Sequence, residues 1–136
     1  MSFTNTIVTA QHLTKIYLPQ TVVDSISFTV QAGQCCGILG PNGAGKTTTL
    51  RMLIGNTPPT SGQLEVLGWQ IPAQARAMRA HIGVVPQRDN LDPDFSVAQN
   101  LAVYGRYFGL SRATLKQRIP GLLEFASLEH KATALI

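Results

Sequence analysis

The sequence predicts an incomplete α/β fold, made of a β-rich layer, part of a mixed core and the start of a helical subdomain. Three observations support this prediction. Apolar and polar residues alternate in segments before residue 34 and within 62–71. A glycine-rich loop at 40–47 stands between an apolar run and a helix-like segment. From residue 95 onward, apolar residues recur at helical spacing.

The β-rich layer comes first along the chain. Three short segments are β-branched or alternate in polarity, as strands do: 7–10, 25–30 and 63–67. Gly62 and Pro72 mark the transitions into and out of the second part of this layer. We therefore expect a single truncated domain over 1–136, in which 1–34 and 62–71 form the β-rich layer, 35–57 and 76–87 the core, and 88–136 the helical part.

The glycine-rich loop, here called the phosphate loop, reads Gly-Pro-Asn-Gly-Ala-Gly-Lys-Thr over residues 40–47. It matches the G-x-x-x-x-G-K-[ST] pattern, or P-loop, whose main-chain N–H groups hold the phosphates of a nucleotide. Glycines allow the positive φ angles that turn successive N–H groups inward around an anion. The residues expected to bind the nucleotide are Gly40, Asn42, Gly43, Ala44, Gly45, Lys46, Thr47 and Thr48.

Two side chains of the loop carry the expected chemistry. Lys46 reaches the β- and γ-phosphates as a point charge, which gives it a catalytic role. The Thr47 hydroxyl is a ligand for Mg²⁺, which takes its other ligands from phosphate oxygens and water. A nucleoside triphosphate and Mg²⁺ are therefore the expected ligands of the loop, and the loop alone does not separate kinases, GTPases and transport ATPases.

The segments on either side of the loop predict a strand–loop–helix unit. Residues 34–39 are expected to form a short buried strand, and 48–54 a helix that ends at Gly55. Cys35 and Cys36 lie in the expected strand, where neighbouring side chains face opposite sides, so we expect two unbridged core thiols.

The helical part begins with a capping box, in which Ser96 and Gln99 satisfy each other's main-chain donors. Ser111 is expected to cap a second helix, and Pro120-Gly121 to kink or split it. The apolar stripe of the first helix is Val97, Leu101, Tyr104 and Phe108. That of the second is Leu115, Ile119, Leu122 and Phe125.

Four further stretches narrow the class of phosphate-loop protein. They are 13–17 and 23–28 before the loop, and 58–64 and 82–87 after it. In this order they resemble the ATP-binding subunit of ABC transporters, which implies an ABC-type P-loop fold with a partial RecA-like core. Residues 86–97 and 104–109 look closer to the branch of drug-resistance and nodulation-type exporters. The resemblance covers residues 8–132 and identifies an N-terminal fragment.

The resemblance assigns roles to two more residues. Tyr17 corresponds to the aromatic that stacks on adenine, although an aromatic at a strand end is also common packing. Gln87 corresponds to the glutamine whose side chain contacts Mg²⁺ or the attacking water, a catalytic and metal-binding role. The nearby Asp89, Asp92 and Asp94 are interpreted as solvated or turn-capping residues.

The same resemblance implies parts beyond residue 136: the signature sequence, the Walker B aspartate, the adjacent general base and the switch histidine. His12, His81 and His130 correspond to none of them. The family resemblance predicts an ATPase, whereas for these 136 residues alone we expect at most weak ATP binding. The neighbour missing from the core strand is also expected to leave an unpaired apolar edge.

Composition implies that a role in transport would need a separate membrane subunit or membrane domain. The chain is 44% hydrophobic, and no apolar run approaches the ~18 residues of a membrane span. Its +4 charge is scattered, which argues against nucleic acid. The resemblance implies a polytopic membrane subunit, a second ATP-binding subunit, and a cytoplasmic location at the inner face of the membrane.

Two alternatives to the exporter subunit stay open on the sequence. One is a non-transport ABC protein, such as a translation or repair factor. The other is a binding-only module without ATPase activity, which sequesters ATP or blocks a full-length partner. The transported substrate is not encoded here, because the membrane subunit chooses it.

Overall fold

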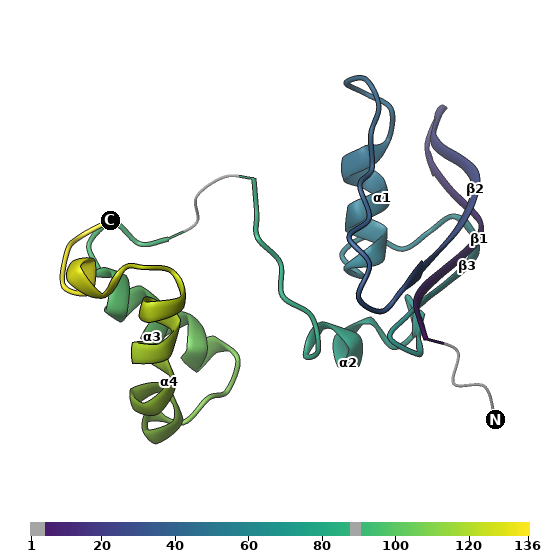
Figure 1. Cartoon of the computed structure of the whole chain (residues 1–136). Coiled ribbons are helices and arrows are strands. Elements are labelled where there is room, and N and C mark those ends of the chain that lie inside the picture. Colours follow the sequence, from purple (N-terminus) through teal and green to yellow (C-terminus); the bar gives the residue numbers. More distant parts are fainter. Residues whose placement is uncertain (1–4, 88–90) are drawn as a thin grey trace. The chain divides into compact units, whose positions relative to one another are not determined.

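The computed structural model describes residues 5–87 and 91–136. The chain divides into two compact units, Met1–Gly83 and Val84–Ile136, and each is described by itself (Figure 1). Across the described residues, no helix combines the length and the apolar character that crossing a bilayer requires.

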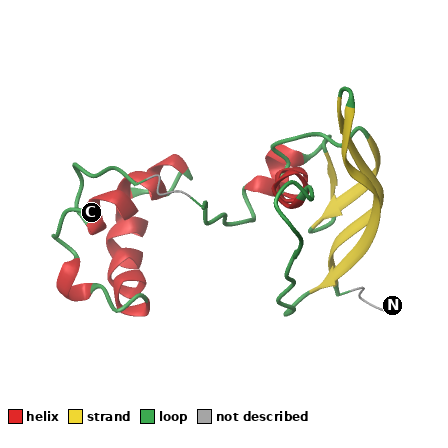
Figure 2. Ribbon diagram, turned by 90° about the horizontal axis from the view of Figure 1, so that it is seen from above, coloured by secondary structure: helices red, strands yellow, loops and turns green. Residues whose placement is uncertain are grey.

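The first unit is built on a four-stranded antiparallel sheet with strand order β2-β1-β3-β4 (Figure 2). The strands are β1 (Thr6–Tyr17), β2 (Gln20–Gln31), β3 (Ser61–Val66) and β4 (Trp69–Ile71). The strands predicted at 7–10, 25–30 and 63–67 lie within or overlap β1, β2 and β3. The β-rich layer is therefore confirmed.

Helix α1 (Lys46–Leu53) lies over one face of this sheet, and α2 (Ala75–Arg79) follows β4 (Figures 1 and 2). The core between them contains four fully buried side chains: Leu13, Met52, Leu64 and Met78. Burying a side chain of this size stabilises the fold by about 1.5–3 kcal/mol. The sheet and α1 thus pack as two layers, and this packing fixes the position of α1, which begins at the phosphate loop.

A bulge in β1 places two core residues on the same face of the sheet. The register with β2 shifts between Ala10 and Leu13, and His12 has a positive φ of 48°. In a regular strand, residues three apart point to opposite faces. Here Ala10 and Leu13 are both buried, so the bulge is what brings both side chains into the core.

The strand predicted over 34–39 does not form, and the cysteines are exposed rather than buried. Residues 34–39 have no regular secondary structure, and Cys35 and Cys36 are free, exposed thiols. Residues 82–85 are equally unpaired, with Val85 97% exposed. A strand exists through hydrogen bonds to a neighbour. Among the described residues, no strand pairs with either segment. Leu39 and Val85 therefore stay in solvent, whereas Ile82 packs, partly buried, against the core.

The second unit contains α3 (Val97–Tyr107), α4 (Arg112–Phe125) and a short 3₁₀ turn, η1 (Glu129–Lys131). Both predicted caps are confirmed. Gln99 Oε1 accepts from Ser96 N at 2.8 Å, and Ser96 Oγ accepts from Gln99 N at 3.3 Å. Ser111 Oγ accepts from Thr114 N at 3.1 Å.

Helix α4 passes through Pro120 without ending, so the predicted split does not occur. Proline removes one main-chain hydrogen bond. Leu115 and Leu123 are buried on either side of it and hold both halves of the helix. The predicted apolar stripe is only partly buried, because Phe125 is 90% exposed and Leu123 takes the buried position instead.

Candidate functional site

The phosphate loop ends where α1 begins, and Gly45 makes the junction. Gly45 is the N-cap of α1, with a left-handed φ of 83°. Its carbonyl accepts from Thr49 N at 2.8 Å and from Thr49 Oγ1 at 3.0 Å, and Thr49 is buried. The first turn of the helix is thereby fixed to the end of the loop.

Gly45 is also the point where the loop contacts the sheet. A Cβ placed on Gly45 would collide with the carbonyl oxygen of Val22 and lie 3.1 Å from Val23 Cγ2. Gly43 has nearly the same φ, 84°, but nothing lies within 4 Å of a Cβ there. Gly43 is thus needed for its backbone angle alone, and Gly45 for both angle and space.

The loop leaves main-chain donors available to an anion. Within residues 5–87 and 91–136, no acceptor is found for the N–H groups of Gly43, Gly45, Lys46, Thr47 and Thr48. Ala44 N, by contrast, donates to Pro41 O at 3.3 Å and closes the loop on itself. Free N–H groups at the start of a helix, together with its positive dipole end, favour bound phosphate.

The two polar side chains expected to bind the ligand lie at the same place. Lys46 Nζ donates to Gly40 O and Pro41 O at 2.7 Å each, so the ammonium bridges the loop's own carbonyls. The Thr47 residue is exposed, and its hydroxyl has no partner among the described residues. A bound phosphate would compete with the two carbonyls for Lys46.

The donors present fit a magnesium-bound polyphosphate. In the described part of the chain, no group of three or more His, Cys, Asp or Glu side chains could hold a metal ion. Mg²⁺ does not need such a group, because it commonly binds through one or two protein oxygens, phosphates and water. Thr47 offers one such oxygen beside the free amides.

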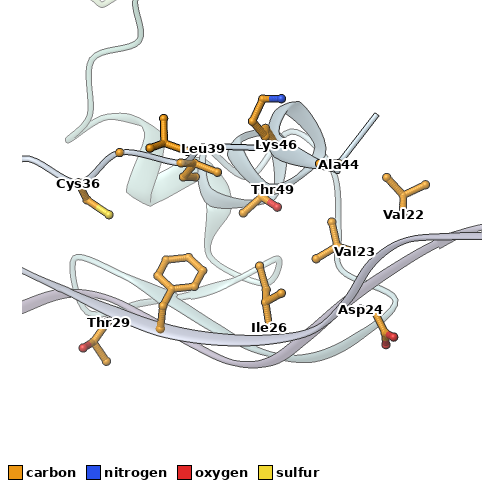
Figure 3. A pocket seen from close by; sticks show the side chains of 13 residues that line it. Val22, Val23, Asp24, Ile26, Thr29, Cys36, Leu39, Ala44, Lys46 and Thr49 are labelled. Carbon is orange, nitrogen blue, oxygen red and sulfur yellow. The ribbon is translucent and has the colours of Figure 1, made fainter. Parts of the chain in front are cut away.

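A cavity of about 440 Å³ lies between β2 and the loop, and Figure 3 shows its lining. Val23 and Ile26 point into it from β2, and Cys36 lines it from the segment before the loop (Figure 3). Its wall is mostly apolar, with Lys46 and Thr49 contributed by the loop and α1, so it is an apolar recess that opens beside the loop.

Neither Tyr17 nor Gln87 has a described contact with the phosphate loop. Tyr17 ends β1, pairs with Gln20, is 47% exposed, and lies under Lys15 Nζ at 5.0 Å from the ring centroid. It does not line the cavity beside the loop. Gln87 is exposed and belongs to the second unit. The adenine and Mg²⁺ roles of these residues stay predictions.

The turn at residues 92–96, just before α3, is organised by a residue that sequence reasoning missed. Asn100, only 2% exposed, accepts from Asp92 N at 2.9 Å and donates to the carbonyls of Asp92, Phe95 and Ser96 at 2.9–3.3 Å. The sequence contained one sign of this role: Asn100 is a polar residue four positions after the N-cap, on the otherwise apolar face of α3. Asp92 Oδ1 accepts from Asp94 N at 3.0 Å, as expected of a turn-capping residue, whereas Asp89 lies outside the described residues.

A comparison with family models now adds to this geometry. The model described as "ABC transporter" matches residues 23–136, which include the phosphate loop, α1 and both helices of the second unit. The chain belongs to the ABC transporter family. Members of this family carry an ATP-binding domain and are ATPases.

Similar curated proteins share one name, "Nod factor export ATP-binding protein I". The chain is 60% identical over 128 residues to the protein of this name from Ralstonia nicotianae, and 57% identical over 126 residues to that from Cupriavidus metallidurans. These alignments cover 94% and 93% of this chain. The chain spans 40% and 42% of the length of these relatives.

A solved structure supports the ABC-type fold. The chain resembles the "Structure of ATP binding subunit of ABC transporter" with a TM-score of 0.79 and 26% sequence identity. The match covers 95% of this chain and 54% of the other. The predicted fold class, a partial ABC ATP-binding domain, is confirmed.

Proposed function

We propose that this chain binds Mg-ATP through the phosphate loop, as part of an ATP-binding subunit that powers export. The observation that carries the proposal is the row of main-chain N–H groups from Gly45 to Thr48. They have no acceptor within the described residues and stand at the N-terminal end of a helix fixed against the sheet. A polyphosphate supplies the acceptors that these groups lack.

Different residues of the loop bind different parts of the ligand. The amides of Gly43 and of the first turn of α1 receive the β-phosphate, and Lys46 exchanges its two carbonyls for β- and γ-phosphate oxygens. Thr47 presents its hydroxyl to the metal ion, which neutralises developing charge on the phosphates during phosphoryl transfer. Tyr17 is proposed to stack on adenine, and Gln87 to contact the metal ion or the attacking water.

The whole protein is proposed to work with a separate polytopic membrane subunit at the inner face of the cell membrane, as a dimer of ATP-binding subunits. Support comes from the family match and from relatives named for Nod factor export. The family match spans residues 23–136 of this chain.

Calorimetry on the folded chain tests the binding step. We expect heat from Mg-ATP at millimolar concentration or below, and a smaller but measurable affinity for Mg-tripolyphosphate, which lacks the base. Lys46→Ala should weaken both ligands by about tenfold or more, since charge-assisted hydrogen bonds are worth roughly 1.5–3 kcal/mol. Lys131→Ala, which removes an exposed cation in the second unit, should change neither.

The role of Tyr17 needs its own comparison. Tyr17→Ala should weaken ATP by about 1–3 kcal/mol, the usual worth of a base–aromatic stack, and leave tripolyphosphate unchanged. Tyr107→Ala is the matched control, because Tyr107 is an exposed tyrosine in the second unit. No heat from Mg-ATP with demonstrably folded protein would refute the proposal as a whole. Equal loss for ATP and tripolyphosphate in Tyr17→Ala would refute only the stacking.

A further inference from the structure

The side chain of Lys15 is held between an aromatic ring and a main-chain carbonyl. Its ammonium nitrogen lies 5.0 Å from the centroid of the Tyr17 ring and donates to Pro58 O at 2.8 Å. Lys15 and Tyr17 are two residues apart in β1, the spacing at which strand side chains share a face. A lysine side chain without contacts samples many rotamers. The two contacts of Lys15 instead keep its charge over the ring.

The segment that supplies the carbonyl is itself fastened to the end of β1. Thr60 N donates to Thr14 O at 2.9 Å, and Ile16 N donates to Thr60 Oγ1 at 3.0 Å. Pro58 is two residues before Thr60, so its carbonyl is a fixed acceptor beside the strand. These two bonds already connect the segment to β1 without Lys15. The position of the ammonium over the ring therefore calls for a reason other than joining the segment to the strand.

The hairpin of β1 and β2, which carries Lys15 and Tyr17, lies against the phosphate loop. Lys15 pairs with Val23 of β2, and Val23 Cγ2 lies 3.1 Å from the place that a Cβ on Gly45 would occupy. Tyr17 pairs with Gln20 at the end of the same hairpin. A base whose phosphates are bound at the loop therefore has this hairpin as a neighbouring surface.

The lysine occupies one face of the Tyr17 ring, and part of the ring stays open. The face of an aromatic ring carries negative charge density, which attracts a cation at this distance. Tyr17 is nevertheless 47% exposed, so the ring also has surface for a ligand. Ordering a mobile side chain is one of the costs of binding. A ring that is already held by one face avoids this cost when a base stacks on the other.

We propose that Lys15 is a positioning residue for base recognition. Its ammonium holds the Tyr17 ring by one face and leaves the opposite face for the base of the nucleotide. The inference rests on the proposed function, in which Tyr17 stacks on adenine. Lys15 thus acts on the base through the ring, whereas Lys46 acts directly on the phosphates.

Calorimetry on the full chain tests this role with Mg-ATP and Mg-tripolyphosphate as the two ligands. Lys15→Met keeps the length of the side chain and removes its charge. It should weaken ATP by about three- to tenfold, the usual effect of having to order one side chain on binding, and leave tripolyphosphate unchanged. Lys15→Arg should restore the ATP affinity, because a guanidinium also binds the face of an aromatic ring. Lys116→Met, which changes an exposed lysine of α4, is the matched control and should alter neither ligand.

A double-mutant cycle separates an effect through the ring from a direct effect of the charge. In the Tyr17→Ala background, Lys15→Met should cause no further loss of ATP affinity, because the lysine no longer has a ring to hold. A direct attraction between Lys15 and the phosphates would persist in that background and would weaken tripolyphosphate as well. NMR of the free chain gives a readout without nucleotide: the Tyr17 ring current should shift the ε-protons of Lys15 upfield, and Tyr17→Ala should abolish the shift.

Several results would overturn the positioning role while leaving phosphate binding by the loop intact. They are an unchanged ATP affinity in Lys15→Met, an equal loss for both ligands, failure of Lys15→Arg to restore the affinity, or unshifted ε-protons in the free chain. A gain in ATP affinity in Lys15→Met would also reject it, because Lys15 would then block the ring. No heat from Mg-ATP with the folded wild-type chain is a different outcome, since it refutes the proposed function and the positioning role together.

Discussion

Two glycines of the phosphate loop, Gly43 and Gly45, have the same backbone conformation and different surroundings. Their φ angles are 84° and 83°. Alanine at such an angle costs about 1–2 kcal/mol, because its Cβ approaches the following carbonyl oxygen. At Gly43 this is the whole expected cost, since a Cβ there meets open space. At Gly45 the Cβ also collides with Val22 O and presses on Val23 Cγ2 at 3.1 Å.

The second cost can be estimated from core overpacking, which usually destabilises by about 1–3 kcal/mol. Val22 O is backbone, so it cannot rotate away, and either β2 or the start of α1 must move. We therefore expect Gly43→Ala to lower the free energy of unfolding by about 1–2 kcal/mol, and Gly45→Ala by about 2–5 kcal/mol. The difference between the two variants measures the contact of Gly45 with β2, because the cost of the backbone angle is the same in both.

The free energy of unfolding of both variants can be measured by urea denaturation with one fluorescence probe. Trp69 in β4 is the single tryptophan of the chain and belongs to the same unit as both glycines, so its fluorescence reports this unit. Circular dichroism provides the check that one transition is observed. If the two variants lose the same stability, the contact of Gly45 with β2 contributes nothing and the reasoning is refuted.

Four further substitutions test the second unit. A Cβ at Gly105 would collide with the Leu115 side chain, whereas one at Gly121 meets open space. Gly105→Ala should therefore destabilise by about 1–3 kcal/mol and Gly121→Ala should stabilise by up to about 1 kcal/mol, both measured by thermal unfolding; the opposite order would contradict the packing. Asn100→Ala should cost about 1–3 kcal/mol by leaving its main-chain partners unsatisfied, seen as faster hydrogen exchange over 92–96; unchanged exchange would count against it. Ser111→Ala should cost about 1 kcal/mol through the lost helix cap, and full retention of stability would show the cap to be redundant.

Local signals predicted much of this structure. The Ser96–Gln99 box and the Ser111 cap are interactions between residues three apart, so sequence contains everything that determines them. The phosphate loop is equally local, because its shape follows from glycines at fixed spacing. The alternating strands of the β-rich layer were also recognisable, since one face of that sheet is buried against α1.

Features that depend on distant partners were not predictable in this way. Residues 34–39 have the composition of a buried strand, but a strand also needs a neighbour, and no described segment pairs with them. The bulge at His12 depends on pairing between β1 and β2, and no local pattern reveals that Ala10 and Leu13 share a face. Asn100 was overlooked because its partners are main-chain groups of a loop whose path the sequence does not state.

Direct backbone contact between the phosphate loop and β2 has a mechanical consequence. Side chains normally separate two elements and can change rotamer to absorb a small shift, but at Gly45 no side chain intervenes. A displacement of a few tenths of an ångström at this junction is passed to the strand undamped, because close-packed interiors have little compressibility. Binding or release of phosphate at the loop would therefore displace β2 at Val22. This is two residues from Gln20, which pairs with Tyr17 across the β1–β2 hairpin.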